Sequence, residues 1–112
     1  MPLNYGDLIA RTARVEFESG EVRQGRVIGM IQGKVRADYV ILQLERVIMS
    51  PESIGYPFVA VCPRFGGDIL DWKSPKATSC YVLVTKASDV SLQPTSEDGL
   101  SLACWADVTF LP

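Results

Sequence analysis

Apolar and polar residues alternate one by one along several short stretches of the chain. In residues 12–18 every second position is apolar, a set made up of Ala13, Val15 and Phe17. A period of two with β-branched and aromatic residues is typical of a half-buried strand. The Ser19-Gly20 pair follows as a turn, because glycine adopts positive φ without steric cost. The pattern therefore predicts a strand, a tight turn and a return strand at residues 21–31.

Two glycines interrupt the return strand, at Gly25 and Gly29. Glycine inside a strand marks a bend, a bulge or the close approach of another strand, and small barrels need such bends to close. Residues 37–44 form the next predicted strand, and residues 46–49 either continue it or begin a short further one.

Three more strands are predicted at residues 57–62, 78–85 and 100–110. Alternation places one set of residues of the last strand on a single face, namely Leu100, Leu102, Cys104, Ala106, Val108 and Phe110. Six or seven short strands at this spacing predict a mainly β fold, either a small, strongly bent barrel of the SH3-like type or a sandwich.

The segments between the strands are of different kinds. Residues 63–76 contain two prolines and a Gly-Gly pair, with apolar side chains that would pin the segment, so we expect one elaborated, compact loop. Residues 86–99 are polar and predict an exposed connection. Residues 4–11 form a candidate short N-terminal helix, since Asn4 is a suitable N-cap.

Length and composition fit one domain spanning residues 1–112, with 47% hydrophobic and 21% charged residues. The net charge of −2 argues against a dedicated polyanion binder. No stretch approaches the roughly 18 apolar residues of a membrane span, and the start lacks the pattern of a signal peptide. We therefore expect a cytoplasmic protein without a membrane partner, whose three cysteines are buried thiols. Whether Cys80 and Cys104 are adjacent stays open.

Histidine is absent from the chain, which removes the commonest general base and the usual zinc ligand. No two cysteines have C-x-x-C spacing, and neither a phosphate loop nor a nucleophile elbow occurs. The sequence therefore predicts no enzyme, no catalytic residue, no cofactor and no metal. Asp68 and Asp71 are the nearest approach to a carboxylate pair, and turn capping is the expected role for both.

Four basic residues stand in a stretch without acidic ones: Arg23, Arg26, Lys34 and Arg36. Clustered on a hairpin, they would form a candidate site for nucleic acid or another anion. Glutamates on the adjoining strand offer the alternative of a solvated face with cross-strand ion pairs.

Three aromatic residues are candidates for interface or ligand contacts: Phe65, Trp72 and Trp105. Alternation places Trp105 on the face opposite Cys104 and Ala106, and aromatic residues are enriched at interfaces. With Val40 and Leu42 we expect Trp105 to form an apolar outer face, which predicts a homo-oligomer or another protein partner.

Residues 13–44 hold a weak, partial resemblance to a known family. The run from Val15 to Met30, with Gly20, Gly25 and Gly29 at its turns and bends, resembles the first motif of Sm-like proteins. That resemblance implies a small, strongly bent barrel of a kind that forms rings and often binds RNA. The Asp and Asn of the family's RNA pocket and its second motif have no clear equivalents here.

Three functions follow as hypotheses. The first is a non-enzymatic binding or adaptor module with a protein–protein or self-association surface. The second is a nucleic-acid binder that uses the basic hairpin at residues 22–36. The third is a small-ligand binder with an aromatic pocket.

Overall fold

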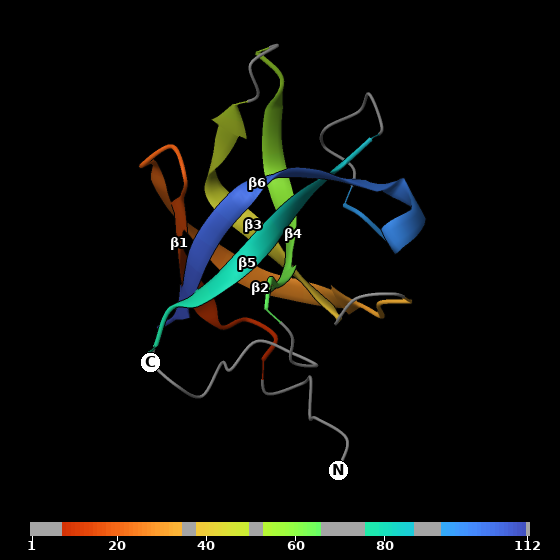
Figure 1. The fold of residues 1–112 in the computed structure, drawn as a ribbon, viewed down its shortest axis with the longest axis horizontal. Helices are drawn as coiled ribbons and strands as arrows, with labels where there is room; N and C mark the ends of the chain where they lie inside the picture. Colours follow the sequence, from red (N-terminus) through yellow and green to blue (C-terminus); the bar gives the residue numbers. More distant parts are fainter. Residues whose placement is uncertain (1–7, 35–37, 50–52, 66–75, 87–92, 112) are drawn as a thin grey trace.

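Six antiparallel strands close into a barrel in which each strand pairs with the next along the chain and β1 pairs with β6 (Figure 1). The computed structural model describes residues 8–34, 38–49, 53–65, 76–86 and 93–111. The strands are β1 Thr12–Phe17, β2 Val22–Ile31, β3 Tyr39–Met49, β4 Gly55–Pro63, β5 Thr78–Thr85 and β6 Leu100–Phe110, and a short 3-10 turn, η2 Glu97–Gly99, precedes β6. The predicted mainly β fold is confirmed, as a closed barrel and not a sandwich.

The β1–β2 hairpin forms where the alternation predicts it. Gly20 has a φ of 94° and donates its N–H to the carbonyl of Phe17 over 2.9 Å. Only glycine adopts this left-handed conformation at no cost, so the residue sets the position of the turn. Register then pairs Val15 with Arg23 and Ala13 with Gly25.

The two glycines of β2 have the roles that the sequence predicts. The register with β3 shifts between Val27 and Gly29, which is a bulge that bends the strand. At Gly25 a Cβ atom would lie only 3.1 Å from the Cβ of Leu42, so the two strands approach closely there.

The larger hydrophobic cluster fills the inside of the barrel. Its fully or nearly fully buried members are Leu8, Ala13, Val15, Phe17, Val27, Val40, Leu42, Leu44, Val59, Val61, Cys80, Val82, Val84, Ala106, Val108 and Phe110. Val40 and Leu42 belong to this cluster, so their predicted place on an outer apolar face is wrong. Four consecutive residues of β3 from Tyr39 onward are buried, and such a run does not reveal which alternate positions face inward.

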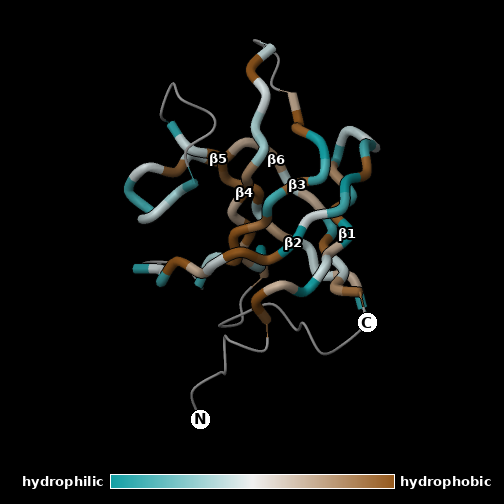
Figure 2. Tube along the Cα trace, turned by 180° about the vertical axis from the view of Figure 1, so that it is seen from behind, coloured by the Kyte–Doolittle hydropathy of each residue, from teal (hydrophilic) through white to brown (hydrophobic). Residues whose placement is uncertain are grey.

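A second cluster packs on the outside of strands β2 to β6. It consists of Ile31, Tyr39, Ile41, Ala60, Cys62, Leu83 and Leu100. In the described part of the connection to β6, Pro94 is buried and the Gln93 amide nitrogen lies 3.4 Å from the Cβ position of Gly29. In the described residues of this connection the expected exposure is confirmed except at the buried Pro94 and the half-buried Glu97, and Gln93 lies against β2. Residues 87–92 lie outside the described part. Figure 2 shows hydrophobic residues concentrated along the strands.

Leu8, which precedes β1 in the chain, closes one end of the barrel. Leu8 is fully buried in the barrel cluster, and the Ala10 N–H donates to the carbonyl of Val27 over 2.8 Å. Residues 8–10 form a turn with Ala10 at a φ of 73°, so the described part of the candidate N-terminal helix is not helical. The burial of Leu8 in the barrel and the hydrogen bond to β2 keep residues 8–10 from forming a helix. Residues 4–7 lie outside the described part.

Strand β6 does not keep a single alternation. Val82 pairs with Cys104 but Leu83 pairs with Leu102, so β6 contains an extra residue at Ala103. Ala106, Val108 and Phe110 face the barrel interior as predicted, whereas Leu102 is 49% exposed and Leu100 joins the outer cluster. The predicted common face is therefore wrong for these two leucines, because the bulge reverses the alternation.

Candidate functional site

A pocket of about 620 Å³ occupies the end of the barrel opposite Leu8. The end of β1, the start of β2, the end of β3 and the start of β4 meet there, together with the end of β5 and the start of β6. Mouths of β-barrels are frequent ligand sites, and this volume lies within the usual range for small molecules. We call this pocket the barrel mouth.

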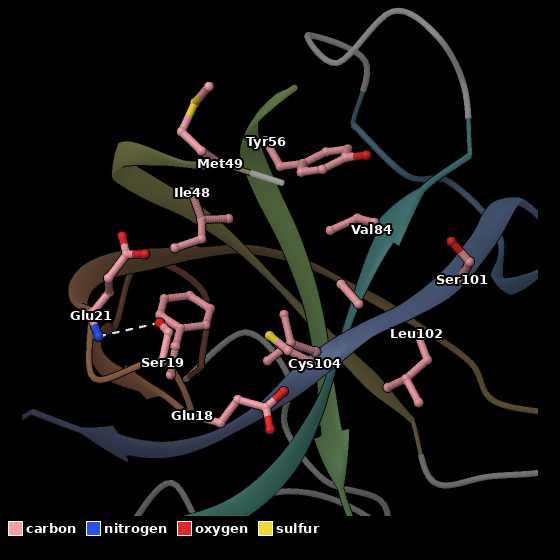
Figure 3. Close-up of a pocket in the computed structure, with 13 residues that line it drawn as sticks. Glu18, Ser19, Glu21, Ile48, Met49, Tyr56, Val84, Ser101, Leu102 and Cys104 are labelled. Carbon is pink, nitrogen blue, oxygen red and sulfur yellow. Dashed lines mark hydrogen bonds between the residues drawn. The ribbon is translucent and has the colours of Figure 1, made fainter. Parts of the chain in front are cut away.

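The walls and floor of the barrel mouth are apolar. Phe17, Val82 and Val84 belong to the barrel core and form its deepest part. Ile48 from β3 and Tyr56 from β4, which lie opposite each other in the ladder, pack against that core (Figure 3). An apolar ligand body would therefore replace water against side chains that are already held in place.

The rim of the barrel mouth is acidic. Among the described residues that line the pocket, Glu18 and Glu21, both in the β1–β2 turn, are the charged ones, and none is basic. Glu21 is neutralised by Arg23, with 2.8 Å between Oε2 and Nη2. Glu18 makes no ion pair within the described residues, although its backbone N–H donates to the carbonyl of Trp105. Glu18 is thus the one unneutralised carboxylate at the rim.

Cys104 lines the same pocket from β6. Burial, and then the negative charge of Glu18, raise the pKa of its thiol to about 11. The thiol is therefore protonated at neutral pH and is not poised as a nucleophile.

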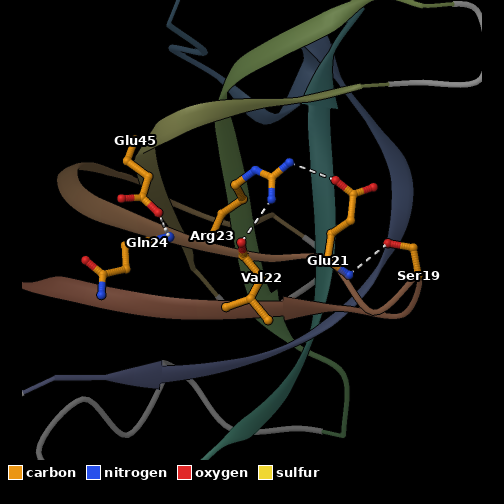
Figure 4. A network of polar contacts seen from close by, with 6 residues as sticks. All are labelled: Ser19, Glu21, Val22, Arg23, Gln24 and Glu45. Atoms are coloured by element: carbon orange, nitrogen blue, oxygen red, sulfur yellow. Dashed lines mark hydrogen bonds and ion pairs between the residues drawn. The ribbon is translucent and has the colours of Figure 1, made fainter.

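The three described members of the predicted basic set, Arg23, Arg26 and Lys34, do not gather on one face. Arg23 opposes the buried Val15, and its guanidinium bonds to Glu21 and to the carbonyl of Val22 (Figure 4). Arg26 is exposed on the alternate face of β2, and Lys34 pairs with Asp98 at 3.3 Å beyond the other end of the strand. Arg36 lies outside the described part. The described members are separated because successive side chains of a strand point in opposite directions.

The predicted aromatic residues Phe65 and Trp105 do come together, with a partner that the sequence did not single out. The guanidinium of Arg64 stacks over both rings, 4.8 Å from the centroid of Phe65 and 4.3 Å from that of Trp105. Phe65 is 81% exposed and Trp105 is 40% exposed. Cation–π stacking holds this group, the aromatic patch, in one arrangement at the surface. Trp72 lies outside the described part.

Carboxylates flank the aromatic patch. Glu16 on β1 and Asp107 on β6 stand directly opposite each other in the ladder, and both are exposed. They line a hollow of about 250 Å³ together with Glu18, Arg64 and Trp105. Like charges directly opposite each other destabilise a strand pair, and Arg14 offsets this only through an exposed contact of 3.3 Å to Glu16.

In the described part of the chain, no three side chains of His, Cys, Asp or Glu are placed so that they could hold a metal ion. Asp68 and Asp71 lie outside that part. Cys62, Cys80 and Cys104 form no disulfide. Cys80 opposes Ala106 and Cys104 opposes Val82, so the two thiols stand on neighbouring strands one alternate position apart and not in direct register.

The sequence missed the residues of the barrel mouth, in particular Glu18, Tyr56 and Cys104. Glu18 lies in the β1–β2 turn, Tyr56 on β4 and Cys104 on β6, and only barrel closure brings them to one end. A usable signal was present for two of them, since Glu18 and Tyr56 each lie within two residues of the end of a predicted strand.

Comparisons with protein-family models, with curated proteins and with solved structures found no match to this chain. In the described residues, no helix has the length and apolar character needed to cross a membrane.

Proposed function

We propose that this protein is a non-enzymatic binding module that works by associating with a second copy of itself through the aromatic patch. The observation that carries the proposal is the stacking of Arg64 on the exposed rings of Phe65 and Trp105. Arginine and aromatic residues dominate the energetically important positions of protein interfaces. Because the stacking already orders these side chains before association, they lose little conformational entropy when two copies meet.

Charge favours a second copy as the partner. A twofold contact brings the same surface of each subunit together, so the surface must be complementary to itself. The aromatic patch has one cation, Arg64, beside the opposed carboxylates Glu16 and Asp107. Across a twofold axis, Arg64 of each copy would meet the acidic pair of the other and offset its repulsion. The Sm-like resemblance of residues 15–30 also implies association of barrels, and three cysteines outside any disulfide fit the expected cytoplasmic location.

Nucleic-acid binding is not the function that the geometry favours. Arg23 is paired with Glu21, Lys34 is paired with Asp98, and the net charge is negative. Phosphate binding needs unpaired cations on one face.

Sedimentation of the full chain at micromolar concentration tests the proposal. We expect a dimer or larger assembly that Phe65→Ser converts to a monomer, while Val47→Ala, which trims an exposed apolar side chain elsewhere, leaves the assembly intact. A monomeric parent protein, or assembly that Phe65→Ser does not weaken, would contradict it.

A charge exchange tests the twofold arrangement. Arg64→Glu places a carboxylate against Asp107 in both halves of the contact, and Asp107→Arg places two cations together, so each variant alone should be monomeric. An equal mixture restores opposite charges at both positions and should form a mixed dimer. Failure of the mixture to associate would overturn this arrangement.

A further inference from the structure

The barrel mouth adjoins the hollow beside the aromatic patch, since Phe17 and Glu18 line both, but it has a different chemical character. Its deep residues are apolar core residues, and its charged residues are both carboxylates. The Glu21 carboxylate is matched by Arg23, which leaves that of Glu18 without an ion pair in the described residues. The mouth therefore offers an apolar cavity of about 620 Å³ with one unmatched negative charge at its edge.

We propose that the barrel mouth binds a small organic ammonium ion, with the cationic head at Glu18 and the apolar body against Phe17, Ile48 and Val84. The proposal does not rest on self-association.

Other ligand classes fit the mouth less well. An anion would meet Glu18 and Glu21 with no unpaired cation among the lining residues. A divalent metal ion needs several oxygen ligands, whereas Glu18 is the only unneutralised carboxylate among the described rim residues. A wholly apolar ligand would leave Glu18 partly desolvated without a partner, which disfavours binding. An ammonium ion with an apolar body satisfies both the carboxylate and the walls.

The field of Glu18 reaches into the cavity. Cys104 lies on the cavity wall, and the negative charge of Glu18 contributes to raising the pKa of this thiol. A cation bound beside Glu18 would therefore change the pKa of the Cys104 thiol, so this residue is a reporter within the site.

Calorimetric titration with three molecules of equal chain length tests the proposal: hexylammonium, hexanol and hexanoate. The titrations use the Phe65→Ser background, so that a change in assembly is not mistaken for ligand binding. We expect hexylammonium to bind about tenfold more tightly than hexanol, as for one charge-assisted contact, and hexanoate to bind more weakly than either. Equal binding of hexylammonium and hexanol would overturn the assignment of the head group.

Two carboxamide variants locate the site. Glu18→Gln should lower hexylammonium affinity about tenfold and leave hexanol unchanged. Glu45→Gln removes an exposed carboxylate of β3 that lines neither the mouth nor the hollow at the aromatic patch, so it should change neither affinity. Bound hexylammonium should also lower the pH midpoint of Cys104 alkylation, because its charge offsets that of Glu18. Binding that neither depends on Glu18 nor shifts this midpoint would place the ligand elsewhere and refute the proposal.

Discussion

At the scale of single residues, Gly25 shows how the missing side chain allows the barrel to close. Its Cβ position lies 3.1 Å from Leu42 Cβ and 3.2 Å from Leu44 Cδ2. Leu42 Cβ is fixed to the backbone of β3, so it can yield only if the strand moves. The glycine was recognisable in the sequence as a point of bending or close approach, but the strand it faces was not.

Replacing Gly25 by alanine should destabilise the domain by about 1–3 kcal/mol, because the added methyl group forces the two strands apart. Gly99→Ala is the matched control: its Cβ position has no neighbour within 4 Å, and no strained φ stands in the way. Chemical denaturation of both variants measures the difference. Equal stability of the two variants would mean that β2 and β3 are less closely packed than described.

Cys104 gives a second prediction at this scale. Burial and then Glu18 raise the pKa of its thiol from 9.0 to about 11. Since only the thiolate reacts, the alkylation rate of Cys104 should rise with pH until about 11, whereas an unfolded chain levels off near 9. Glu18→Gln should lower the midpoint only part of the way, because burial is the larger cause. Peptide mapping after timed alkylation measures the profile, and a midpoint at 9 in the folded protein would contradict the prediction.

The functional residues were foreseeable to different degrees. Phe65 and Trp105 stood out as large aromatic residues in a turn-rich segment and on the polar face of a strand. Arg64 did not, because its role depends on β4 and β6 lying on either side of β5. The inward direction of the Arg23 side chain could not be predicted, because it follows from pairing with the buried Val15. That pairing is known only once the register between β1 and β2 is known.

At the scale of elements, β6 marks the limit of pattern reasoning. The residues from Ala106 to Phe110 alternate as predicted, but the extra residue at Ala103 reverses the faces before it. A bulge moves a side chain to the other face of the strand without any change of residue type, so the sequence does not reveal the shift. The position of the strand was therefore predictable, while the direction of two of its side chains was not.

Leu100→Ala and Leu102→Ala should differ although unbroken alternation would make them equivalent. Leu100 is buried in the outer cluster, and its truncation should cost about 2–5 kcal/mol. Leu102 is half exposed, and its truncation should cost less than about 1 kcal/mol. Urea denaturation compares them directly, with each variant serving as the control for the other. Similar losses would mean that Leu102 is as buried as Leu100, which would contradict the described packing on the outside of β6.

At the scale of the whole molecule, the order of strands and their meander pairing were predictable, because each strand is short, apolar and followed by a turn. Which side of the sheet becomes the inside was not. β4 is buried continuously from Val59 to Pro63, since the barrel cluster covers one face and the outer cluster the other. Two apolar faces remove the alternation that would distinguish inside from outside.

The two ends of the barrel are unlike, and this difference leads to a final prediction. Leu8 is fully buried where β1 begins, whereas Met49, at the barrel mouth, is 52% exposed. Leu8→Ala should therefore remove a core contact, leave a cavity and cost about 2–5 kcal/mol. Met49→Ala removes a side chain of similar size from a site already open to water, so the cost should stay below about 1 kcal/mol. Thermal unfolding of both variants measures this asymmetry, and a loss at Met49 as large as that at Leu8 would mean that the mouth is closed by its own side chains and holds no ready-made site.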